Sequence, residues 1–368
     1  MLFRLGVKED PSEFYNFEDE LRMLGLGLRD SLTRLIVVKG VRRIGKSSLV
    51  RVGFKLYGVR FYVFFDARAI PVVSVEDVFV LVSRGLSDLM RRSSGVRGAL
   101  KSLLSRVEGV SVAGVDVRVR PGRPRLLVDI VEALGRVAEE LGDRIVLFFD
   151  EAQDLAVVPG FSRLLAHIYD YVDSVKIVMA GSEIGLLDRL LGRRDPRAPL
   201  YGRPYLEIEM ARLDRERSTD FLLKGFRELG IEWSRGNIEE AVNELDGIPG
   251  WLTSYGYYSY VTRDHSAALK RVIKEGALIV RREISAFLEI RRQARRRYLS
   301  ILKCLSLGPM RWAELKTCME AQIGRAINKS QYTRYLRELR DYSFIEKTGE
   351  GLYRLADPLI RHAVARAL

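Results

Sequence analysis

An apolar run that leads at once into a glycine-bounded, lysine-containing turn constrains this chain more than any other segment. Residues 35–38 read LIVV and residues 40–50 read GVRRIGKSSLV. The turn fits GxxxxGK[ST] without a mismatch, and the following residues, SSLVRVGFKLY, have a helical pattern. Between a strand and a helix, the glycines let successive backbone N–H groups converge on phosphate oxygens, and the helix N-terminus adds positive partial charge. The sequence therefore predicts a phosphate-binding loop here.

Each residue type in this loop suits one part of a nucleotide. Lys46 would reach the β- and γ-phosphates, and the Ser47 hydroxyl would ligate Mg²⁺. The expected cofactors are therefore ATP and Mg²⁺. The residues assigned to nucleotide binding are Gly40, Val41, Arg42, Arg43, Ile44, Gly45, Lys46, Ser47 and Ser48.

A second apolar run ends in two carboxylates. Residues 144–151 read RIVLFFDE, which places Asp150 and Glu151 at the carboxyl end of a buried strand. Asp150 would hold the Mg²⁺, and Glu151 would activate water for attack on the γ-phosphate. The alternative interpretation is that Asp150 and Glu151 are only two solvated acids at the end of a strand. The next run, VKIVMAGSE, ends near Ser182, whose hydroxyl would sense the γ-phosphate or, in a simpler interpretation, cap the following helix.

Composition narrows the class of protein. The chain has 368 residues and a formal charge of +13, which favours a polyanionic partner but equally suits an ordinary basic surface. Its two cysteines are too few for a disulfide framework, and its three widely spaced histidines indicate no zinc site. No apolar stretch approaches the ~20 residues that span a bilayer, and no signal peptide is visible. We therefore expect a cytoplasmic protein in a reducing compartment.

The order of patterns along the chain predicts three units. Residues 1–213 contain apolar runs at 35–38, 61–65, 145–149 and 175–179, and a weaker one at 205–210. These runs indicate an α/β fold with a parallel sheet. An inserted β-hairpin is expected near 108–122, closed by Pro121 and Gly122. Residues 214–290 have helical periodicity. Residues 291–368 have three helical patterns and then a two-stranded ribbon, which is the order of a winged helix.

Several segments together resemble a known family. GVRRIGKSSLV, FFDEAQ, MAGSEIGLL, PLYGRPYLEIEM and DGIPGWLTSYG are similar to the archaeal ATPase family of P-loop proteins, which are AAA+/STAND-like NTPases. The similarity covers nearly all of residues 10–290, and the double arginine and the GIPGWL segment are its most distinctive parts. The resemblance implies the sheet order 5-1-4-3-2, a helical lid, ATP with Mg²⁺, and a C-terminal winged helix.

The resemblance also implies roles that spacing does not. Pro249 would pack near the adenine, although a glycine-proline turn between two helices explains the same residues. Arg203 would sense phosphate, with Arg193, Arg194 and Arg197 as nearby alternatives and a solvated loop arginine as the simpler interpretation. The family's entry segment beside the base carries Phe17 where an arginine is expected, so an aromatic ring would stack on adenine there.

The two arginines of the loop and the C-terminal unit complete the predictions. We expect Arg42 and Arg43 to pair with acids of the core or lid rather than to act in catalysis. In the candidate recognition helix, Lys329, Arg334, Arg337 and Arg340 would contact double-stranded DNA, whereas a winged helix used as a latch or protein-docking surface is the competing interpretation.

The predicted function is an Mg²⁺-dependent ATPase whose nucleotide state moves the winged helix, with Lys46, Glu151, Ser182 and Arg203 as catalytic residues. The alternatives are a slow nucleotide-dependent switch or scaffold and an ATP-controlled transcription factor. A homo-oligomer or a protein partner is possible in each case.

Overall fold

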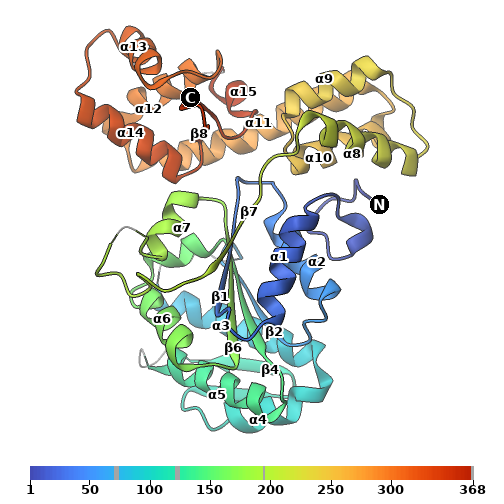
Figure 1. Cartoon of the computed structure of the whole chain (residues 1–368), viewed down its shortest axis with the longest axis vertical. Helices are drawn as coiled ribbons and strands as arrows, with labels where there is room; N and C mark the ends of the chain where they lie inside the picture. The colour runs from blue at the N-terminus through green and yellow to red at the C-terminus, as the bar shows by residue number, and fades with distance from the viewer. Residues whose placement is uncertain (70–73, 121–124, 194, 366–368) are drawn as a thin grey trace.

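The centre of the molecule is a five-stranded parallel sheet. The structure, a computed structural model, describes residues 1–69, 74–120, 125–193 and 195–365. The strands lie in the order β2-β5-β6-β1-β7 (Figure 1). Numbered along the chain among themselves, they have the order 5-1-4-3-2, which confirms the expectation from the resemblance. Their bounds are β1 (Leu35–Lys39), β2 (Tyr62–Asp66), β5 (Ile145–Asp150), β6 (Val175–Gly181) and β7 (Leu206–Glu209).

Helices cover both faces of this sheet, which explains why its strands are almost continuously apolar. Alternate residues of β1 point to opposite faces: Ile36 and Val38 belong to one buried cluster, and Leu35 and Val37 belong to the other. The first cluster is closed by α1 (Glu18–Arg29) and α2 (Lys46–Leu56). The second is closed by α3 (Val75–Arg92), α5 (Leu126–Glu140), α6 (Phe161–Tyr171) and α7 (Ile184–Leu190).

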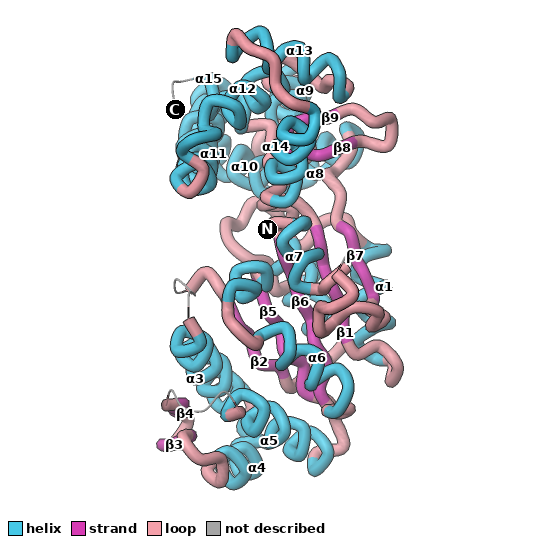
Figure 2. Tube along the Cα trace, turned by 90° about the vertical axis from the view of Figure 1, so that its left-hand side faces the viewer, coloured by secondary structure: helices cyan, strands magenta, loops and turns pink. Residues whose placement is uncertain are grey.

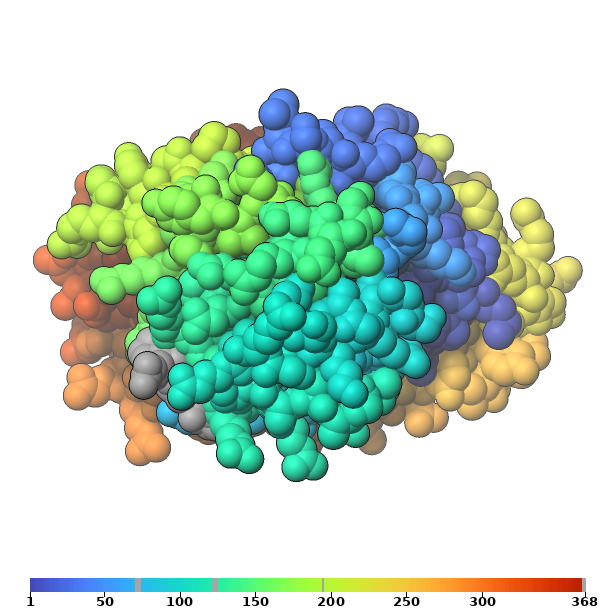
Figure 3. All heavy atoms as spheres, turned by 90° about the horizontal axis from the view of Figure 1, so that it is seen from below, coloured from blue at the N-terminus to red at the C-terminus, as the bar shows by residue number. Residues whose placement is uncertain are grey.

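The inserted hairpin lies on the second face. Strands β3 (Val110–Ala113) and β4 (Asp116–Val119) pair in antiparallel register, as the alternating sequence predicts, and α4 (Arg97–Leu104) precedes them. The hydroxyl of Ser87 in α3 accepts from the Val117 backbone N–H at 2.8 Å, so the hairpin is fixed to that helix. Pro121 and Gly122, the predicted end of the hairpin, lie outside the described residues. Seen from below, this insertion and its helices form much of the lower surface (Figure 3).

The residues after the sheet form a helical layer. Its helices are α8 (Arg215–Glu228), α9 (Arg235–Leu245), α10 (Pro249–Thr262) and α11 (His265–Glu289). The N-terminal segment is fixed to this layer, because the Leu2 backbone N–H donates to Glu228 at 2.8 Å and the Phe3 ring packs on Phe226. Within the layer, buried Tyr255 contacts His265, so the aromatic residues of α10 serve partly in packing.

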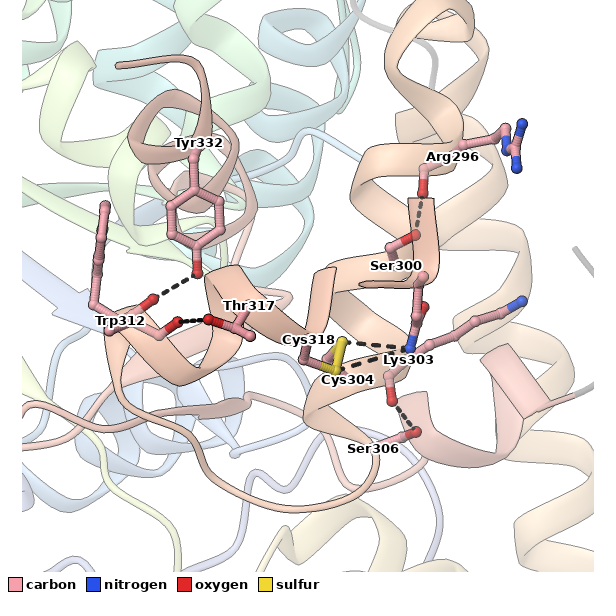
Figure 4. Close-up of a disulfide and its surroundings, with 11 residues drawn as sticks. Arg296, Ser300, Lys303, Cys304, Ser306, Trp312, Thr317, Cys318 and Tyr332 are labelled. Atoms are coloured by element: carbon pink, nitrogen blue, oxygen red, sulfur yellow. Dashed lines mark hydrogen bonds between the residues drawn. A yellow bond between two sulfur atoms is a disulfide. The ribbon is translucent and has the colours of Figure 1, made fainter. Parts of the chain in front are cut away.

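A winged helix ends the chain. Its elements are α12 (Arg295–Leu305), α13 (Trp312–Ile323), α14 (Lys329–Asp341), β8 (Ile345–Lys347), β9 (Tyr353–Leu355) and α15 (Ile360–Ala365). Cys304 of α12 and Cys318 of α13 form a disulfide (Figure 4). The expectation that the cysteines serve no disulfide framework therefore needs a correction. The short loop between two packed helices brings the two sulfurs together, and such a bond is rare in a reducing compartment.

The α8–α15 layers lie above the edge of the sheet at which the strands end, and α11 runs from the α8–α10 group to the α12–α14 group (Figures 1 and 2). None of the helices in the described part of the chain is long and apolar enough to cross a membrane. The unit boundaries near residues 213 and 290 remain predictions.

Candidate functional site

The predicted phosphate-binding loop links β1 to α2. A Cβ at Gly40 would lie 2.8 Å from the Met210 carbonyl oxygen, so only glycine lets the loop pass the end of β7. Gly45 has φ +106° and caps the N-terminus of α2. Lys46, the first residue of α2, is buried, and its Nζ donates to the carbonyl oxygens of Gly40 and Val41 at 2.9 Å each. The loop thus forms a closed turn around the lysine.

The predicted carboxylates lie beside this loop, at the same edge of the sheet. Ser47 Oγ donates to Asp150 Oδ2 at 2.6 Å. Glu151 Oε2 accepts from Ser182 Oγ at 2.6 Å and from the Ser182 backbone N–H at 3.1 Å. Gln153 Nε2 donates to the same oxygen at 2.7 Å. The structure therefore brings Ser47, Asp150, Glu151 and Ser182 together, and Glu151 is held in one orientation.

Burial and charge act against each other in this cluster. Burial lowers the pKa of Lys46 to about 8, although Glu151 and Asp150 oppose this change. Burial would raise the pKa of Glu151, but Lys46 and the hydrogen bonds from Gln153 and Ser182 outweigh it and bring that pKa to about 2. Burial, together with the charge of Glu151, raises the pKa of Asp150. Glu151 is therefore ionised at neutral pH.

A cavity of about 340 Å³ lies over the loop, within the size range of small-molecule sites. Its wall includes residues 43–48 of the loop, Arg68 and Glu151. It also includes the rings of Phe14 and Phe17 and other residues of the entry segment and the helical layer. The wall therefore has groups that can hold phosphates and rings that can contact a flat base.

Pro249 lies in the wall of this cavity, as expected for the predicted base-contacting residue. It is also the first residue of α10, which fits the simpler turn interpretation. The next residue, Gly250, donates its backbone N–H to the Arg43 carbonyl oxygen at 3.0 Å. Phe17 lines the same cavity, and its ring lies 6.0 Å from that of Phe14. The helical layer thus contacts the phosphate-binding loop directly.

The two loop arginines pair with acids, as the sequence predicts. Arg42 forms ion pairs with Glu183, after β6, and with Glu283 of α11 at 3.6 Å. Arg43, at φ +67°, lies 2.7 Å from Glu283 and 3.3 Å from Asp357. The pairs therefore connect the loop to the core, to α11 and to the winged helix.

Arg203 lies elsewhere. Its guanidinium pairs with Asp170 of α6, and Arg203 is not among the residues that line the cavity. Arg193 pairs with Glu207, and Arg197 pairs with Asp195. Arg194 lies outside the described residues. Arg203, the predicted phosphate-sensing arginine, therefore does not lie beside Lys46 and Glu151 of the same chain, and its role stays a prediction.

Arg68 and Gln153 are in the site although sequence reasoning did not select them. Arg68 follows β2, and its guanidinium lies 3.5 Å from Asp150 Oδ2 and 3.6 Å from Glu151 Oε1. The register pairs Asp66 with Asp150, so the sheet order alone places residues after Asp66 beside the carboxylates. A second cavity, of about 350 Å³, also has Glu151 in its wall, together with Arg42, Arg68 and Gln153.

The basic residues of α14 are exposed, as direct contact with DNA would require. The buried side of this helix carries Tyr332, Tyr335, Leu336 and Leu339, whereas Lys329, Arg334, Arg337 and Arg340 are exposed. The C-terminal end of α14 contacts α7. Asp341 pairs with Arg189 there, and Ser343 Oγ accepts from the Ile184 backbone N–H at 3.3 Å.

Known proteins resemble both parts of the chain. A Walker-type ATPase of Pyrococcus abyssi superposes with a TM-score of 0.80 and 29% identity, over 99% of this chain and 100% of that one. An ORC2 protein of Aeropyrum pernix has the same fold, with a TM-score of 0.60 and 13% identity, over 98% of both chains. The DNA mismatch repair protein MutS of Thermus aquaticus is 28% identical in an alignment of 232 residues. That alignment covers 54% of this chain and only 26% of that protein.

Family models match two consecutive segments. Residues 292–356 match the C-terminal winged helix-turn-helix domain of MCM proteins. Residues 14–254, which contain the loop, both carboxylates and Pro249, match an ATPase domain that occurs predominantly in Archaea. The chain belongs to this family of nucleotide-binding ATPases.

Proposed function

We propose that this protein is an Mg²⁺-dependent ATPase in which the state of the nucleotide moves the C-terminal winged helix, and that the winged helix binds double-stranded DNA. The observation that carries the proposal is the cluster of Lys46, Ser47, Asp150, Glu151 and Ser182 at one edge of the sheet. The family and the fold support the ATPase activity, and the cluster supports the roles assigned to its individual residues.

The residues present fit Mg²⁺. This ion is usually held by one or two carboxylates together with waters and substrate phosphates, rather than by a cage of protein ligands. Ser47 Oγ and Asp150 Oδ2 are hard oxygen donors 2.6 Å apart beside the loop. Among the described residues, no group of three or more His, Cys, Asp or Glu side chains could hold a metal by itself, which agrees with a site that the nucleotide completes. When bound, the ion would neutralise charge on the phosphates.

In this mechanism the side chains orient and stabilise rather than react. Lys46 would exchange its two carbonyl acceptors for phosphate oxygens. Glu151, ionised and fixed by Ser182 and Gln153, would accept a hydrogen bond from the attacking water and aim it at the γ-phosphorus. With a pKa of about 2, this carboxylate is a weak proton acceptor, so its main contribution is to position the water. The base would lie between the aromatic rings and Pro249, as STAND-type proteins imply.

Arg43 supports a link between the nucleotide and the winged helix. Its guanidinium lies 4.4 Å from the centroid of Trp251 and 3.3 Å from Asp357. The indole N–H of Trp251 donates to the same carboxylate at 3.1 Å. Because Arg43 belongs to the phosphate-binding loop, a nucleotide that reshapes this loop would act directly on the start of the last helix.

Two variants test the ATPase roles. We expect Lys46→Ala to lose nucleotide binding, and Glu151→Gln to retain binding while turnover falls by about 10²-fold or more. Lys270→Ala and Glu289→Gln, which change exposed residues of α11, are the matched controls. Isothermal titration with ATP and a phosphate-release assay measure the two effects. If Glu151→Gln leaves turnover unchanged, the catalytic assignment is wrong, and a slow nucleotide switch or scaffold becomes the better description.

A salt titration tests DNA binding. If Lys329, Arg334, Arg337 and Arg340 contact phosphates, the logarithm of the association constant falls linearly with the logarithm of salt concentration, and replacing one of them reduces the slope by about 1. A slope near zero would remove DNA from the proposal and leave protein contacts. Strong binding of one duplex, independent of hydrolysis, would favour an ATP-controlled transcription factor.

Assembly and compartment are also part of the proposal. The ion pair with Asp170 holds Arg203 away from the nucleotide site of its own chain. In that position Arg203 could reach a nucleotide only in a neighbouring copy, so the predicted sensing role requires a homo-oligomer. We propose the cytoplasm as the compartment, because both ATP and chromosomal DNA are available there.

A further inference from the structure

Arg68 is the arginine of the site that no acid holds closely. It lies two residues after the end of β2 and lines both cavities, as Glu151 does. Its distances to Asp66, Asp150 and Glu151 are 3.5–3.6 Å, longer than direct hydrogen bonds. More than half of its side chain, 56%, is exposed. The guanidinium is therefore near three carboxylates without being fixed by any of them.

The other arginines that line the cavities are already engaged. Arg42 is held by Glu183, and Arg43 is held by Glu283 at 2.7 Å and stacks on Trp251. Moving either one toward a nucleotide would leave a carboxylate unpaired in a half-buried or buried position, which is costly. Arg68 has only ion pairs of 3.5–3.6 Å to lose, and Asp150 and Glu151 keep their hydrogen bonds from Ser47, Gln153 and Ser182 when it moves, so it is the arginine best able to approach a phosphate.

A cation bound at Asp150 would displace the Arg68 guanidinium. Asp150 Oδ2 faces the guanidinium at 3.5 Å, and the same oxygen accepts from Ser47 Oγ. Ser47 Oγ and Asp150 Oδ2 are the proposed Mg²⁺ ligands. A divalent cation bound to Asp150 Oδ2 and a guanidinium beside the same oxygen would repel each other. With the cation in place, Arg68 keeps Asp66 and Glu151 at 3.6 Å, and a terminal phosphate between Lys46 and Glu151 would be a further anion within its reach.

We infer that Arg68 contacts the γ-phosphate of bound ATP and supplies, within the same chain, the positive charge that stabilises the transition state of hydrolysis. In that reaction the water oxygen bonds to the γ-phosphorus, the bond to the bridging oxygen breaks, and its electron pair leaves with ADP, while the proton lost by the water passes to an oxygen of the released phosphate. A guanidinium at the γ-phosphate oxygens offsets the charge that spreads over them. This inference rests on the proposed function, and it gives Arg68 the task that sequence reasoning assigned to Arg203.

The alternative is that Arg68 only neutralises the carboxylates. A neutralising residue would influence ATP and ADP alike, because Asp150 and Glu151 are present in both complexes. A residue that contacts the γ-phosphate would distinguish the two nucleotides, because ADP lacks that group. The ratio of the ATP and ADP dissociation constants therefore separates the two roles.

The test compares Arg68→Ala and Arg68→Lys with the wild type. For Arg68→Ala we expect weaker binding of a non-hydrolysable ATP analogue by about tenfold, unchanged ADP binding, and kcat lower by about 10²-fold or more. Arg68→Lys should recover part of both losses, since it keeps the charge but not the planar fork. Arg60→Ala is the matched control, because Arg60 precedes the same strand at its opposite end and pairs with Asp143 at 2.7 Å.

Equal losses for the ATP analogue and ADP would overturn the inference, as would an unchanged kcat together with an unchanged ratio. Circular dichroism and the ADP affinity report whether the variants are folded. If Arg68→Ala is unfolded, the ratio of the ATP-analogue to the ADP dissociation constant measured on Arg68→Lys decides. A weakened γ-phosphate contact raises this ratio above that of the wild type, whereas loss of simple neutralisation leaves it unchanged. Absence of turnover in the wild type would refute the proposed hydrolysis, but the binding ratio with the analogue would still decide the role of Arg68.

Discussion

At the scale of single residues, the polar end of the site follows from local sequence. Lys46 and Ser47 are fixed by a loop of a few residues, and Asp150 and Glu151 by the end of one strand. Parallel strands end at the same edge of the sheet, so the two motifs had to meet once the fold class was predicted. The partners of Arg42 and Arg43 could be foreseen only as acids, because they lie between 140 and 315 residues away along the chain.

Arg68 shows what a motif search misses. No pattern of residues marks it, and its place depends on β2 lying next to β5. That adjacency was implied by the resemblance, so combining the strand order with the basic residues at strand ends would have found it. The cavity walls are harder to predict, because they join the entry segment to α8 and α10 by tertiary contacts.

The depressed pKa of Glu151 predicts a pH-dependent contribution to stability. Its pKa is about 2 in the folded protein against 4.5 ordinarily, so the unfolded chain holds the proton up to a higher pH. The stabilisation is complete above pH 4.5 and is lost as the pH falls through 2. We expect the free energy of unfolding of the wild type, minus that of Glu151→Gln, to be about 2 kcal/mol larger at pH 6 than at pH 3.

Chemical denaturation at several pH values measures this difference, and Glu289→Gln on the exposed face of α11 is the control. A difference between wild type and Glu151→Gln that stays constant from pH 3 to pH 6 would show that the carboxylate is not held in its ionised form by its neighbours.

At the scale of secondary-structure elements, the winged helix is joined by more than packing. Figure 4 shows the disulfide between α12 and α13, and Tyr332 of α14 donates to the Trp312 carbonyl oxygen at 3.2 Å. The three helices are thus connected in series. Residue counts could not predict the disulfide, because two cysteines 14 residues apart form one only if the loop between their helices turns back tightly.

Removing this bond should destabilise the winged helix alone. A disulfide that closes a loop of about 15 residues contributes about 3 kcal/mol by restricting the unfolded chain. We expect reduction, or the double change of Cys304 and Cys318 to serine, to lower the unfolding midpoint of the winged helix and to leave nucleotide affinity unchanged.

Calorimetry with and without reductant measures this effect, and the double serine variant is the control, because reductant cannot affect it. Two titratable thiols in the untreated native protein, or identical midpoints before and after reduction, would contradict the prediction.

At the scale of the whole molecule, the winged helix contacts the ATPase core at several places in the described part of the chain, and two of them lie near the nucleotide site. One is the α14–α7 contact, where α7 begins two residues after Ser182 and a Cβ at Gly185 would lie 2.4 Å from the Asp341 Cα. The other is Arg43 with Asp357, which is buried and also accepts the Trp251 indole N–H. The first contact thus lies just after Ser182, and the second begins at Arg43, both of which line the cavities.

If the second contact transmits the nucleotide state, Arg43→Ala and Asp357→Asn should act through one pathway. We expect each to reduce the effect of ATP on DNA affinity by about fivefold or more, and the double variant to be no worse than either single one. Fluorescence anisotropy measures the DNA affinity with and without an ATP analogue. The control is Arg282→Ala, at an exposed position of α11.

Additive effects of the two changes would mean that they act independently. Full retention of ATPase activity and stability in the double alanine variant of Arg42 and Arg43 would count against the structural role of both arginines.

The length of α11 adds a mechanical consequence. This helix has 25 residues and is therefore about 37 Å long, at about 1.5 Å per residue. It packs along α10 and leads into the winged helix, so a tilt of about 10° at its origin would displace its far end by about 6 Å. That displacement is close to two base-pair steps of about 3.4 Å each. Arg42 and Arg43 hold Glu283 near that far end, so a nucleotide that releases these pairs would free the end of the rod that carries the winged helix to move into a new register on DNA.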